Sequence, residues 1–366
     1  MRKKASTDIQ AVFCGICGFR TETALFEHVR TEHGLDAAGY EQKCPGAPLF
    51  TEAFGRYVSE HGLDSQNGRL MSRRTLFGRK IVCDMAPAEH VPAMDDAYEF
   101  DEKLARNVLL SLEANDRILL VGPTGCGKSS LVMQLAARLN WPLTRANLHG
   151  ETSANDFVGQ WVVEKGEMVF RYGLLPRAMK DGHILILEEL DAAEPAILFV
   201  LQGVLEENGK LVLAEKGGEI VEPHPRFRLV ATANTLGLGD ESGLYTGTRV
   251  LNASHLDRWA ACYAMSYLPP AAEEQLLVRK TPGLARKTAE ALVRLAGAVR
   301  EARQQDQVFC EFSTRRLLAL GRKLVLLKDL NQALEIAVLN KLAANDRKVV
   351  YELTQRHLPE IEGGAA

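Results

Sequence analysis

The strongest pattern in the sequence is a series of short apolar runs, each followed by a loop or a helical stretch. RILLVG, HILILE and FRLVATAN are such runs, at residues 117–122, 183–188 and 227–234. Short, continuous apolar runs are typical of strands buried on both faces, and their alternation with helical patterns predicts a parallel sheet covered by helices. We therefore expect an α/β core over residues 101–268.

Three other patterns flank this core. Residues 1–46 hold four metal-ligating side chains in a short segment and predict a small zinc-binding module. Residues 47–100 contain turn signals such as NGR and predict a linker with some helix, leading into the core. Residues 269–366 have a helical pattern almost throughout, as in LARKTAEALVRLAGAVREA, and predict a helical lid domain.

The composition narrows the class of protein. The chain has 366 residues with 46% hydrophobic and 25% charged side chains and a net charge of -3, which is typical of a soluble globular protein. This charge argues against a nucleic-acid coat or a membrane-surface protein. The sequence contains no apolar run long enough to span a membrane, and MRKKASTDIQ lacks the apolar region of a secretory signal. The 7 cysteines are an odd number, which favours reduced thiols and a cytoplasmic protein.

The loop GPTGCGKS, residues 122–129, follows the first predicted strand and precedes the amphipathic stretch SSLVMQLAARL. Its spacing is G-x-x-x-x-G-K-[ST], in which backbone N–H groups and a helix N-terminus surround a phosphate. In this pattern Lys128 reaches the β- and γ-phosphates of ATP and Ser129 binds Mg²⁺. The predicted nucleotide-binding residues are Gly122, Pro123, Thr124, Gly125, Cys126, Gly127, Lys128, Ser129 and Ser130.

Three acids follow the second predicted strand, at Glu188, Glu189 and Asp191. A buried carboxylate needs a compensating charge, and Mg²⁺ bound to ATP supplies one. We expect Glu188 to orient the metal and Glu189 to position or activate the attacking water. Asp191 is expected to cap the helix that follows. The alternative is a nucleotide-dependent scaffold with damaged hydrolysis.

Three segments outside this loop carry a resemblance to a known family. They are AARLNWPLTRANLHGETSANDFVG (136–159), EPHPRFRLVATANTLGLGDESGLYTGT (222–248) and HLDRWAACYAMSYLP (255–269). They resemble AAA+ ATPases of the MoxR branch, and most closely the small ATPase subunit of aerobic cobaltochelatase, the CobS type. The family has Asp-Glu where this chain has Glu188-Glu189, a departure that bears on the hydrolysis rate rather than on ATP binding.

The resemblance implies roles for three further residues. Asn234, at the end of the third strand, resembles the sensor-1 residue that positions water near the γ-phosphate. Arg258 resembles the arginine finger that reaches the ATP of a neighbouring subunit, with a local ion pair to Asp257 as the alternative. Arg315 resembles the sensor-2 arginine at the start of a lid helix, and its neighbour Arg316 is the alternative.

The resemblance also implies an assembly and a partner. The assembly would be a homo-oligomer in the form of a hexameric ring, and the partner a larger von Willebrand A-domain protein of the CobT type. The implied function is ATP-driven remodelling of that partner for cobalt insertion into a corrinoid. The alternatives are a MoxR-like chaperone for another target, or a nucleic-acid-associated motor.

Two predicted hairpins carry a further implication of the family. They are WVVEKGEMVF (161–170) and GKLVLAEKGGEIVEP (209–223). In the family such hairpins line the centre of the ring and contact the substrate. Ordinary surface hairpins are the alternative.

The N-terminal segment has its own chemistry. Cys14, Cys17, His28 and His33 have the spacing C-x2-C-x10-H-x4-H, which resembles a C2H2 zinc finger. Two free thiols with surface histidines are the alternative. Residues 1–46 contain equal numbers of basic and acidic side chains, so we expect a structural or partner-docking module and do not favour nucleic acid.

Overall fold

A computed structural model of the protein describes residues 11–21, 25–35, 37–49, 51, 63–64, 69–84, 89–148, 152–237, 239, 245 and 247–358. The chain separates into two compact units. One comprises Met1–Val91 with Ala136–Pro142, and the other Pro92–Leu135 with Leu143–Ala366.

The first unit begins with a small module built from two short strands and two helices. Its elements are β1 (Val12–Phe13), β2 (Arg20–Thr21), α1 (Phe26–His33) and α2 (Ala37–Lys43). The strands are antiparallel, and Leu25, Val29 and Tyr40 pack with Val12 and Cys14 in a small buried cluster. An apolar core of this size contributes little stability, so such a module needs an additional constraint.

The same unit contains a three-stranded antiparallel sheet. Its strands are β3 (Leu63–Asp64), β4 (Arg69–Leu76) and β5 (Arg79–Asp84), in the order β3-β4-β5. The sequence predicted a linker with some helix over residues 47–100; the structure has no helix at residues 63–64, 69–84 and 89–100, and residues 52–62 lie outside the described residues. A two-residue turn at Phe77 and Gly78, both with positive φ, closes β4 onto β5. The turn was the available signal, and it was masked by the many charged residues in β4.

The second unit is built on a five-stranded sheet in which every pairing is parallel. Its strands are β6 (Ile118–Val121), β7 (Leu143–Asn147), β10 (Ile184–Glu188), β13 (Arg228–Ala233) and β14 (Ala261–Ala264). Their order is β14-β6-β13-β10-β7. The predicted parallel sheet is therefore confirmed. The strand that ends at Asn234 lies between the strand of the phosphate loop (residues 122–129) and the acidic strand.

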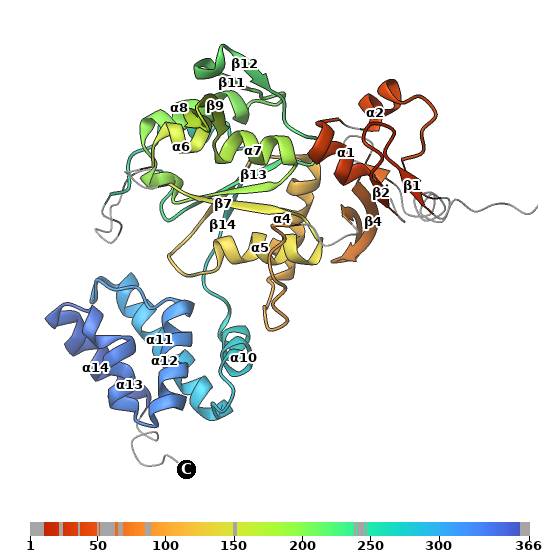
Figure 1. Cartoon of the computed structure of the whole chain (residues 1–366). Coiled ribbons are helices and arrows are strands. Elements are labelled where there is room, and N and C mark those ends of the chain that lie inside the picture. The colour runs from red at the N-terminus through yellow and green to blue at the C-terminus, as the bar shows by residue number, and fades with distance from the viewer. Residues whose placement is uncertain are drawn as a thin grey trace, which may run out of the picture. The chain divides into compact units, whose positions relative to one another are not determined.

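Helices cover both faces of this sheet, as Figure 1 shows. One face carries α4 (Glu102–Ala114) and α5 (Lys128–Arg138), and the other carries α7 (Leu174–Asp181) and α8 (Pro195–Leu205). The central strands are fully buried, as their continuous apolar sequences predict. Three short elements complete this part: α6 (Ala154–Val158), η1 (Leu190–Ala192) and α9 (Ala253–Leu256).

Both predicted hairpins are present. The first consists of β8 (Gly159–Glu164) and β9 (Glu167–Tyr172), and the second of β11 (Leu211–Leu213) and β12 (Glu219–Val221), with the turn η2 (Ala214–Lys216) between its strands. The indole N–H of Trp161 in the first hairpin donates to the carbonyl of Glu215 in the second, at 2.8 Å.

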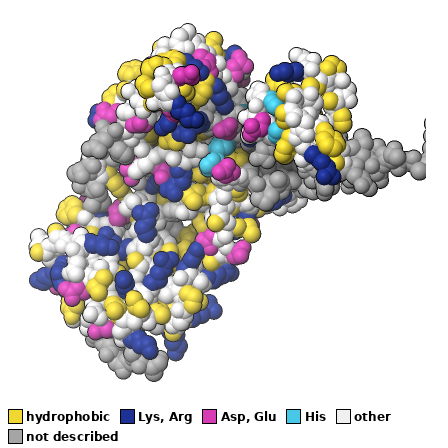
Figure 2. Space-filling view, in the orientation of Figure 1, with side chains coloured by type: hydrophobic (Ala, Val, Ile, Leu, Met, Phe, Trp, Pro, Cys, Tyr) yellow, Lys and Arg dark blue, Asp and Glu magenta, His cyan; other side chains and the backbone are white. Residues whose placement is uncertain are grey.

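The C-terminal part is helical, as predicted, and is called the lid below. It consists of α10 (Pro270–Lys280), α11 (Arg286–Gln304), α12 (Thr314–Leu327), α13 (Leu330–Ala337), η3 (Leu339–Lys341) and α14 (Ala344–His357). These helices share one buried apolar cluster, and side chains of both charges are spread over their visible face in Figure 2. Among the described residues, no helix combines the length and apolar character needed to cross a membrane.

Candidate functional site

The phosphate loop connects β6 to α5, and its glycines are required by close contacts. A Cβ atom on Gly122 would lie 2.3 Å from the carbonyl oxygen of Met265, just after β14. Gly125 has φ +68°, and a Cβ there would lie 2.7 Å from the Cβ of Ser313 in the lid. The loop is therefore fixed between the edge of the sheet and the start of a lid helix, with its backbone free to approach a phosphate.

Lys128 is the first helical residue of α5, and its ammonium group is directed back over the loop. Nζ donates to the carbonyls of Gly122 and Pro123, at 2.6 and 3.1 Å, and to Oδ1 of Asn234 at 3.0 Å. Burial lowers the pKa of Lys128, and the nearby acids Glu189 and Asp191 are among the groups that oppose this shift. The structure thus brings together the predicted phosphate-binding lysine and the predicted sensor-1 asparagine.

Ser129 and Glu188 also meet, as expected from their predicted roles. The hydroxyl of Ser129 donates to Oε1 of Glu188 at the end of β10. The other carboxylate oxygen, Oε2, accepts from Nη2 of Arg145 on β7, at 2.7 Å. A hydroxyl beside a carboxylate offers the hard oxygen ligands that Mg²⁺ prefers, so these two residues fit the metal that the loop predicts.

Glu189 has a backbone conformation that is rare for a residue with a side chain. Its φ and ψ are 59° and 47°, in the left-handed region, which costs on the order of 1 kcal/mol or more for such a residue. The residue lines a cavity of about 560 Å³ together with Thr124, Asp191 and Asn234. Strain of this kind is often found at functional sites.

Asp191 has a different structural role from the helix cap that the sequence indicated. Helix α8 begins at Pro195 with Glu194 as its N-cap residue, so the expected capping role of Asp191 is wrong. Asp191 is fully buried, and its Oδ2 accepts from the backbone N–H groups of Asn234 and Thr235, both at 2.9 Å, and from the Thr235 hydroxyl at 3.0 Å. Asp191 therefore holds the backbone of Asn234, the predicted sensor-1 residue, a role that the local sequence did not reveal.

A second cavity, of about 300 Å³, also borders the phosphate loop. Gly125, Cys126, Gly127 and Ser130 line it from the loop, and Arg315 lines it from the lid. Burial raises the pKa of the Cys126 thiol, which keeps it neutral. A nucleotide bound to the loop can extend into this cavity.

The two neighbouring lid arginines are directed into different cavities. Arg315 lies with the phosphate-loop glycines, and its Cβ is 3.5 Å from the Cβ that Gly125 would carry. Arg316 lines the larger cavity, with Glu189 and Asn234. The structure therefore places both candidates for the sensor-2 residue in cavities that border the phosphate loop.

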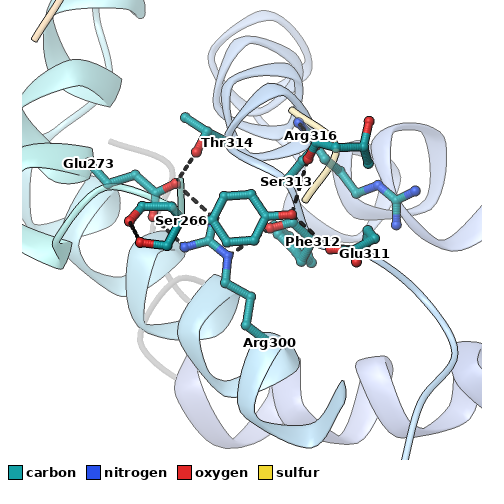
Figure 3. A network of polar contacts seen from close by, with 10 residues as sticks. Ser266, Glu273, Arg300, Glu311, Phe312, Ser313, Thr314 and Arg316 are labelled. Carbon is teal, nitrogen blue, oxygen red and sulfur yellow. Dashed lines mark hydrogen bonds and ion pairs between the residues drawn. The ribbon is translucent and has the colours of Figure 1, made fainter. Parts of the chain in front are cut away.

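A buried ion pair fixes the start of the lid helix that carries these arginines. Arg300 on α11 binds both carboxylate oxygens of Glu273 on α10, each at 2.7 Å, and Glu273 is 1% exposed. Thr314, the first residue of α12, donates its hydroxyl to the same carboxylate at 2.6 Å, and Nε of Arg300 donates to the carbonyl of Phe312 (Figure 3). Breaking any member leaves another polar group buried without its partner.

Two tyrosines connect the phosphate loop to the lid. The backbone N–H of Thr124 donates to the hydroxyl of Tyr245, and its carbonyl accepts from the hydroxyl of Tyr267, at 3.3 and 3.1 Å. Both hydroxyls also donate to Glu311, which precedes α12. Burial and the Glu311 carboxylate raise the pKa of Tyr245 to about 12 and raise that of Tyr267 as well, so both remain protonated donors at neutral pH.

Arg258 is not brought to the ATP site of its own chain. Its Nε donates to Glu206 at 2.9 Å and Nη1 donates to the carbonyl of Ser254 at 2.5 Å. It lines neither of the two cavities described above.

The four residues Cys14, Cys17, His28 and His33, the Cys/His cluster, lie together in the first unit. All four ligand atoms lie within 4.8 Å of one another. Sγ of Cys14 is 3.4 Å from Nε2 of His33, and Sγ of Cys17 is 3.0 Å from Nε2 of His28. Two thiolates and two imidazoles at this separation fit the tetrahedral ligand set of Zn²⁺.

Residues around the cluster hold its cysteine turn in place. The hydroxyl of Tyr40, on α2, accepts from the backbone N–H of Gly15 at 2.7 Å. A Cβ on Gly15 would lie 3.0 Å from Sγ of Cys44. Helix α2, which lies beyond the C2H2 spacing, is therefore part of the module that presents the cysteines.

The phosphate loop, the acids at the end of β10 and the strand order β14-β6-β13-β10-β7 together define a P-loop ATPase of the AAA+ class. Residues 117–249 match the AAA domain (dynein-related subfamily), and residues 273–356 match the CbbQ/NirQ/NorQ C-terminal family. The segment between 236 and 248 that resembled this family most specifically lies partly outside the described residues.

Known proteins place the chain within this class. The aerobic cobaltochelatase subunit CobS of Sinorhizobium sp is 37% identical over 275 residues, covering 73% of this chain and 82% of that protein. Protein NorQ of Paracoccus denitrificans is 33% identical over 231 residues, covering 63% of this chain and 81% of that protein. The von Willebrand factor A domain-containing protein 8 of Mus musculus is 28% identical over 230 residues, covering 60% of this chain and 12% of that protein. The chain belongs to the MoxR-type AAA+ ATPases, the family of CobS and NorQ.

Proposed function

We propose that this ATPase hydrolyses ATP at the interfaces of a hexameric ring and uses the cycle to remodel a partner protein. The observation that carries the proposal is the convergence of Lys128, Asn234, Ser129, Glu188 and Glu189 at one edge of the sheet. These residues come from three different strand ends, and an ATP site gives each of the five side chains a role.

Each residue has a defined task in this proposal. Lys128 exchanges its bonds to the loop carbonyls for the β- and γ-phosphates, and Ser129 and Glu188 hold the metal site. Mg²⁺, when bound, supplies positive charge that offsets the charge developing on the phosphate oxygens. Glu189 takes up the proton of the attacking water, and Asn234 positions that water.

Two arginines complete the site. Arg258 acts in trans as the arginine finger, because its only described partners are Glu206 and Ser254 and it lines neither cavity of its own chain. Arg315 acts as the sensor-2 residue, because it lies against the phosphate loop at Gly125. Arg316 is the alternative, because it lines the cavity of Glu189.

The proposed partner is a protein with a von Willebrand A domain. The murine relative carries such a domain by its name, and the CobS relative is a cobaltochelatase subunit. We infer cobalt insertion into a corrinoid as the process served, with a chaperone role for another target as the alternative. The two joined hairpins present exposed apolar side chains, at Trp161, Val163, Val212 and Ile220, that suit contact with a protein.

Mixed assemblies test the ATPase part of this proposal. Lys128→Ala should abolish ATP binding, whereas Glu189→Gln and Arg258→Ala should bind ATP and lose about 10²-fold or more in turnover. Mixing Arg258→Ala with Lys128→Ala subunits should restore part of the activity, because each supplies what its neighbour lacks. Arg294→Ala on the lid surface is the control. Loss of activity in Arg258→Ala that no mixture restores would contradict an interface site.

The Cys/His cluster supports a second proposal, a structural Zn²⁺ in the N-terminal module. Metal analysis should give about one Zn²⁺ per chain, and Cys14→Ser/Cys17→Ser should remove it. Cys262→Ser, an exposed cysteine in the other unit, is the control and should retain the metal. Protein purified without chelator and free of zinc would contradict the proposal.

A further inference from the structure

The acid at the end of β10 is bound by two groups at once, and one of them has no assigned role. Glu188 accepts from Ser129 through Oε1 and from Arg145 through Oε2. Its side chain is 17% exposed and that of Arg145 is 49% exposed. The carboxylate therefore joins α5, which carries the phosphate-loop serine, to β7, the edge strand of the sheet.

We propose that Arg145 is a positioning residue that orients Glu188 toward the metal site, and that it sets the Mg²⁺ dependence of nucleotide binding. The proposal rests on the function proposed above. It also accounts for glutamate rather than the shorter aspartate at this position. An aspartate carboxylate would end one carbon–carbon bond earlier, about 1.5 Å, and could not reach both partners from the same backbone.

The register of the sheet explains how the arginine reaches the site. Strands β7 and β10 are parallel, with Arg145 opposite Ile186 and Asn147 opposite Glu188. The side chains of Arg145 and Asn147 lie on the same side of β7, because the two residues are two positions apart in the strand. The side chain of Arg145 therefore extends along the strand direction to reach Glu188, which lies two residues beyond its paired residue Ile186. Only a long side chain can span this distance.

The charges determine what this contact does. A guanidinium is always protonated and binds a carboxylate oxygen in a fixed direction. While Arg145 holds Oε2, Oε1 stays directed at Ser129 even when the serine hydroxyl turns to a metal ion. Without Arg145 the carboxylate of Glu188 can rotate. Fixing it in the metal-binding orientation then costs conformational entropy, and this cost weakens the binding of Mg²⁺. The expected defect is therefore in the metal requirement, not in the affinity for the metal-free nucleotide.

The test measures binding of a fluorescent, slowly hydrolysed ATP analogue to the full chain, in EDTA and at increasing Mg²⁺. Arg145→Ala should raise the Mg²⁺ concentration for half-maximal binding about threefold to tenfold, with unchanged affinity in EDTA. Arg145→Lys should rescue only in part, because a lysine keeps the charge but not the directed contact. Arg294→Ala, which removes an exposed ion-paired arginine on α11, should match the parent protein.

Glu188→Asp should show the same shift as Arg145→Ala, and the double variant should show no further shift, because the two act as one unit. An unchanged or lowered Mg²⁺ requirement in Arg145→Ala would overturn the inference, as would full rescue by Arg145→Lys, since the effect would then be one of charge alone. Equal weakening in EDTA would also overturn it, because Arg145 would then contact the nucleotide. Failure of the parent protein to bind the analogue at any Mg²⁺ concentration would instead contradict the proposed function.

Discussion

The ATP site and the Cys/His cluster are held together in different ways. In the ATP site three charged groups already have protein partners: Lys128 binds loop carbonyls and Asn234, Glu188 binds Ser129 and Arg145, and Asp191 accepts backbone N–H groups. In the Cys/His cluster the four ligand atoms face one another within 4.8 Å.

This difference determines how much each ligand contributes to the folding of the region that binds it. The ATP site lies on a sheet whose central strands β6, β10 and β13 are almost entirely buried, so we expect its geometry to persist whether or not a nucleotide is bound. Among the described residues of the small module, five are buried in its apolar cluster, which is too few to order it without help. We therefore expect ATP to bind to a site that is already folded, whereas the N-terminal module should need zinc in order to fold.

Removal of zinc should have the largest effect on stability, and it tests most directly whether the two regions depend on their ligands in different ways. Metal binding of this type contributes on the order of 10 kcal/mol to folding. Chelation should therefore abolish amide protection in residues 11–49 by hydrogen exchange, with protection of β6 and α5 and the affinity for ATP unchanged. Parallel loss of protection in both regions, or none in residues 11–49, would show that the two regions do not differ in this way.

The buried ion pair of the lid provides the next test, since it holds α12 without any ligand. Glu273→Gln should destabilise the lid by about 3–5 kcal/mol, because Arg300, whose side chain is 16% exposed, loses its counter-charge. Denaturation followed by helical circular dichroism measures this effect. Glu274→Gln is the matched control, because Glu274 pairs with the exposed Arg286 and should cost far less. Equal stability of the two variants would contradict the importance of burial.

Asp191 tests whether the ATP site is held by the protein itself. Asp191→Asn replaces a charged acceptor by a neutral one, so it should cost about 1–3 kcal/mol of stability and lower turnover more than ATP affinity, because Asn234 loses its fixed position. Steady-state hydrolysis and nucleotide binding separate the two effects. Asp306→Asn, at an exposed position, is the control. A defect confined to ATP binding would argue against the positioning of Asn234.

The smallest expected effect concerns Tyr40, which holds the cysteine turn of the Cys/His cluster in place. Tyr40→Phe removes the acceptor for the Gly15 N–H and should weaken zinc binding about tenfold, as is typical of groups that orient metal ligands. Competition with a chromogenic chelator measures this affinity, and Tyr351→Phe in the lid is the control. An unchanged affinity would mean that the cysteine turn needs no support from α2.

The sequence predicted those parts of the molecule in which spacing along the chain determines position in space. The phosphate loop, the acidic strand and Asn234 each lie at the end of an apolar run, and parallel strands bring such ends to one edge of a sheet. The Cys/His spacing also predicted that four ligands converge. Short-range patterns were sufficient for these features because the backbone geometry of strands and helices is regular.

The parts that were missed depend on contacts between distant segments. Asp191 was assigned to the nearest helix, although its partners at Asn234 and Thr235 lie more than forty positions away. Arg145 and Glu188 meet only because β7 and β10 are neighbours, which the order of apolar runs does not determine. The tyrosine contacts between phosphate loop and lid are of the same kind. The contacts of Asp191 and Arg145 arise from the sheet order, and those of the tyrosines arise from the position of Glu311 in the lid; none of them follows from local sequence.

The link between the two hairpins has a mechanical consequence. Trp161 donates to Glu215, and the hydroxyl of Tyr172 donates to Glu219 across the same boundary. Hydrogen bonds from Lys216, Lys180 and Tyr172 lower the pKa of Glu219 to about 2, so its carboxylate stays ionised except in strong acid. Neither hairpin can swing alone without breaking these bonds. If the second hairpin is displaced, these bonds carry the first hairpin with it, so the two hairpins move as one unit.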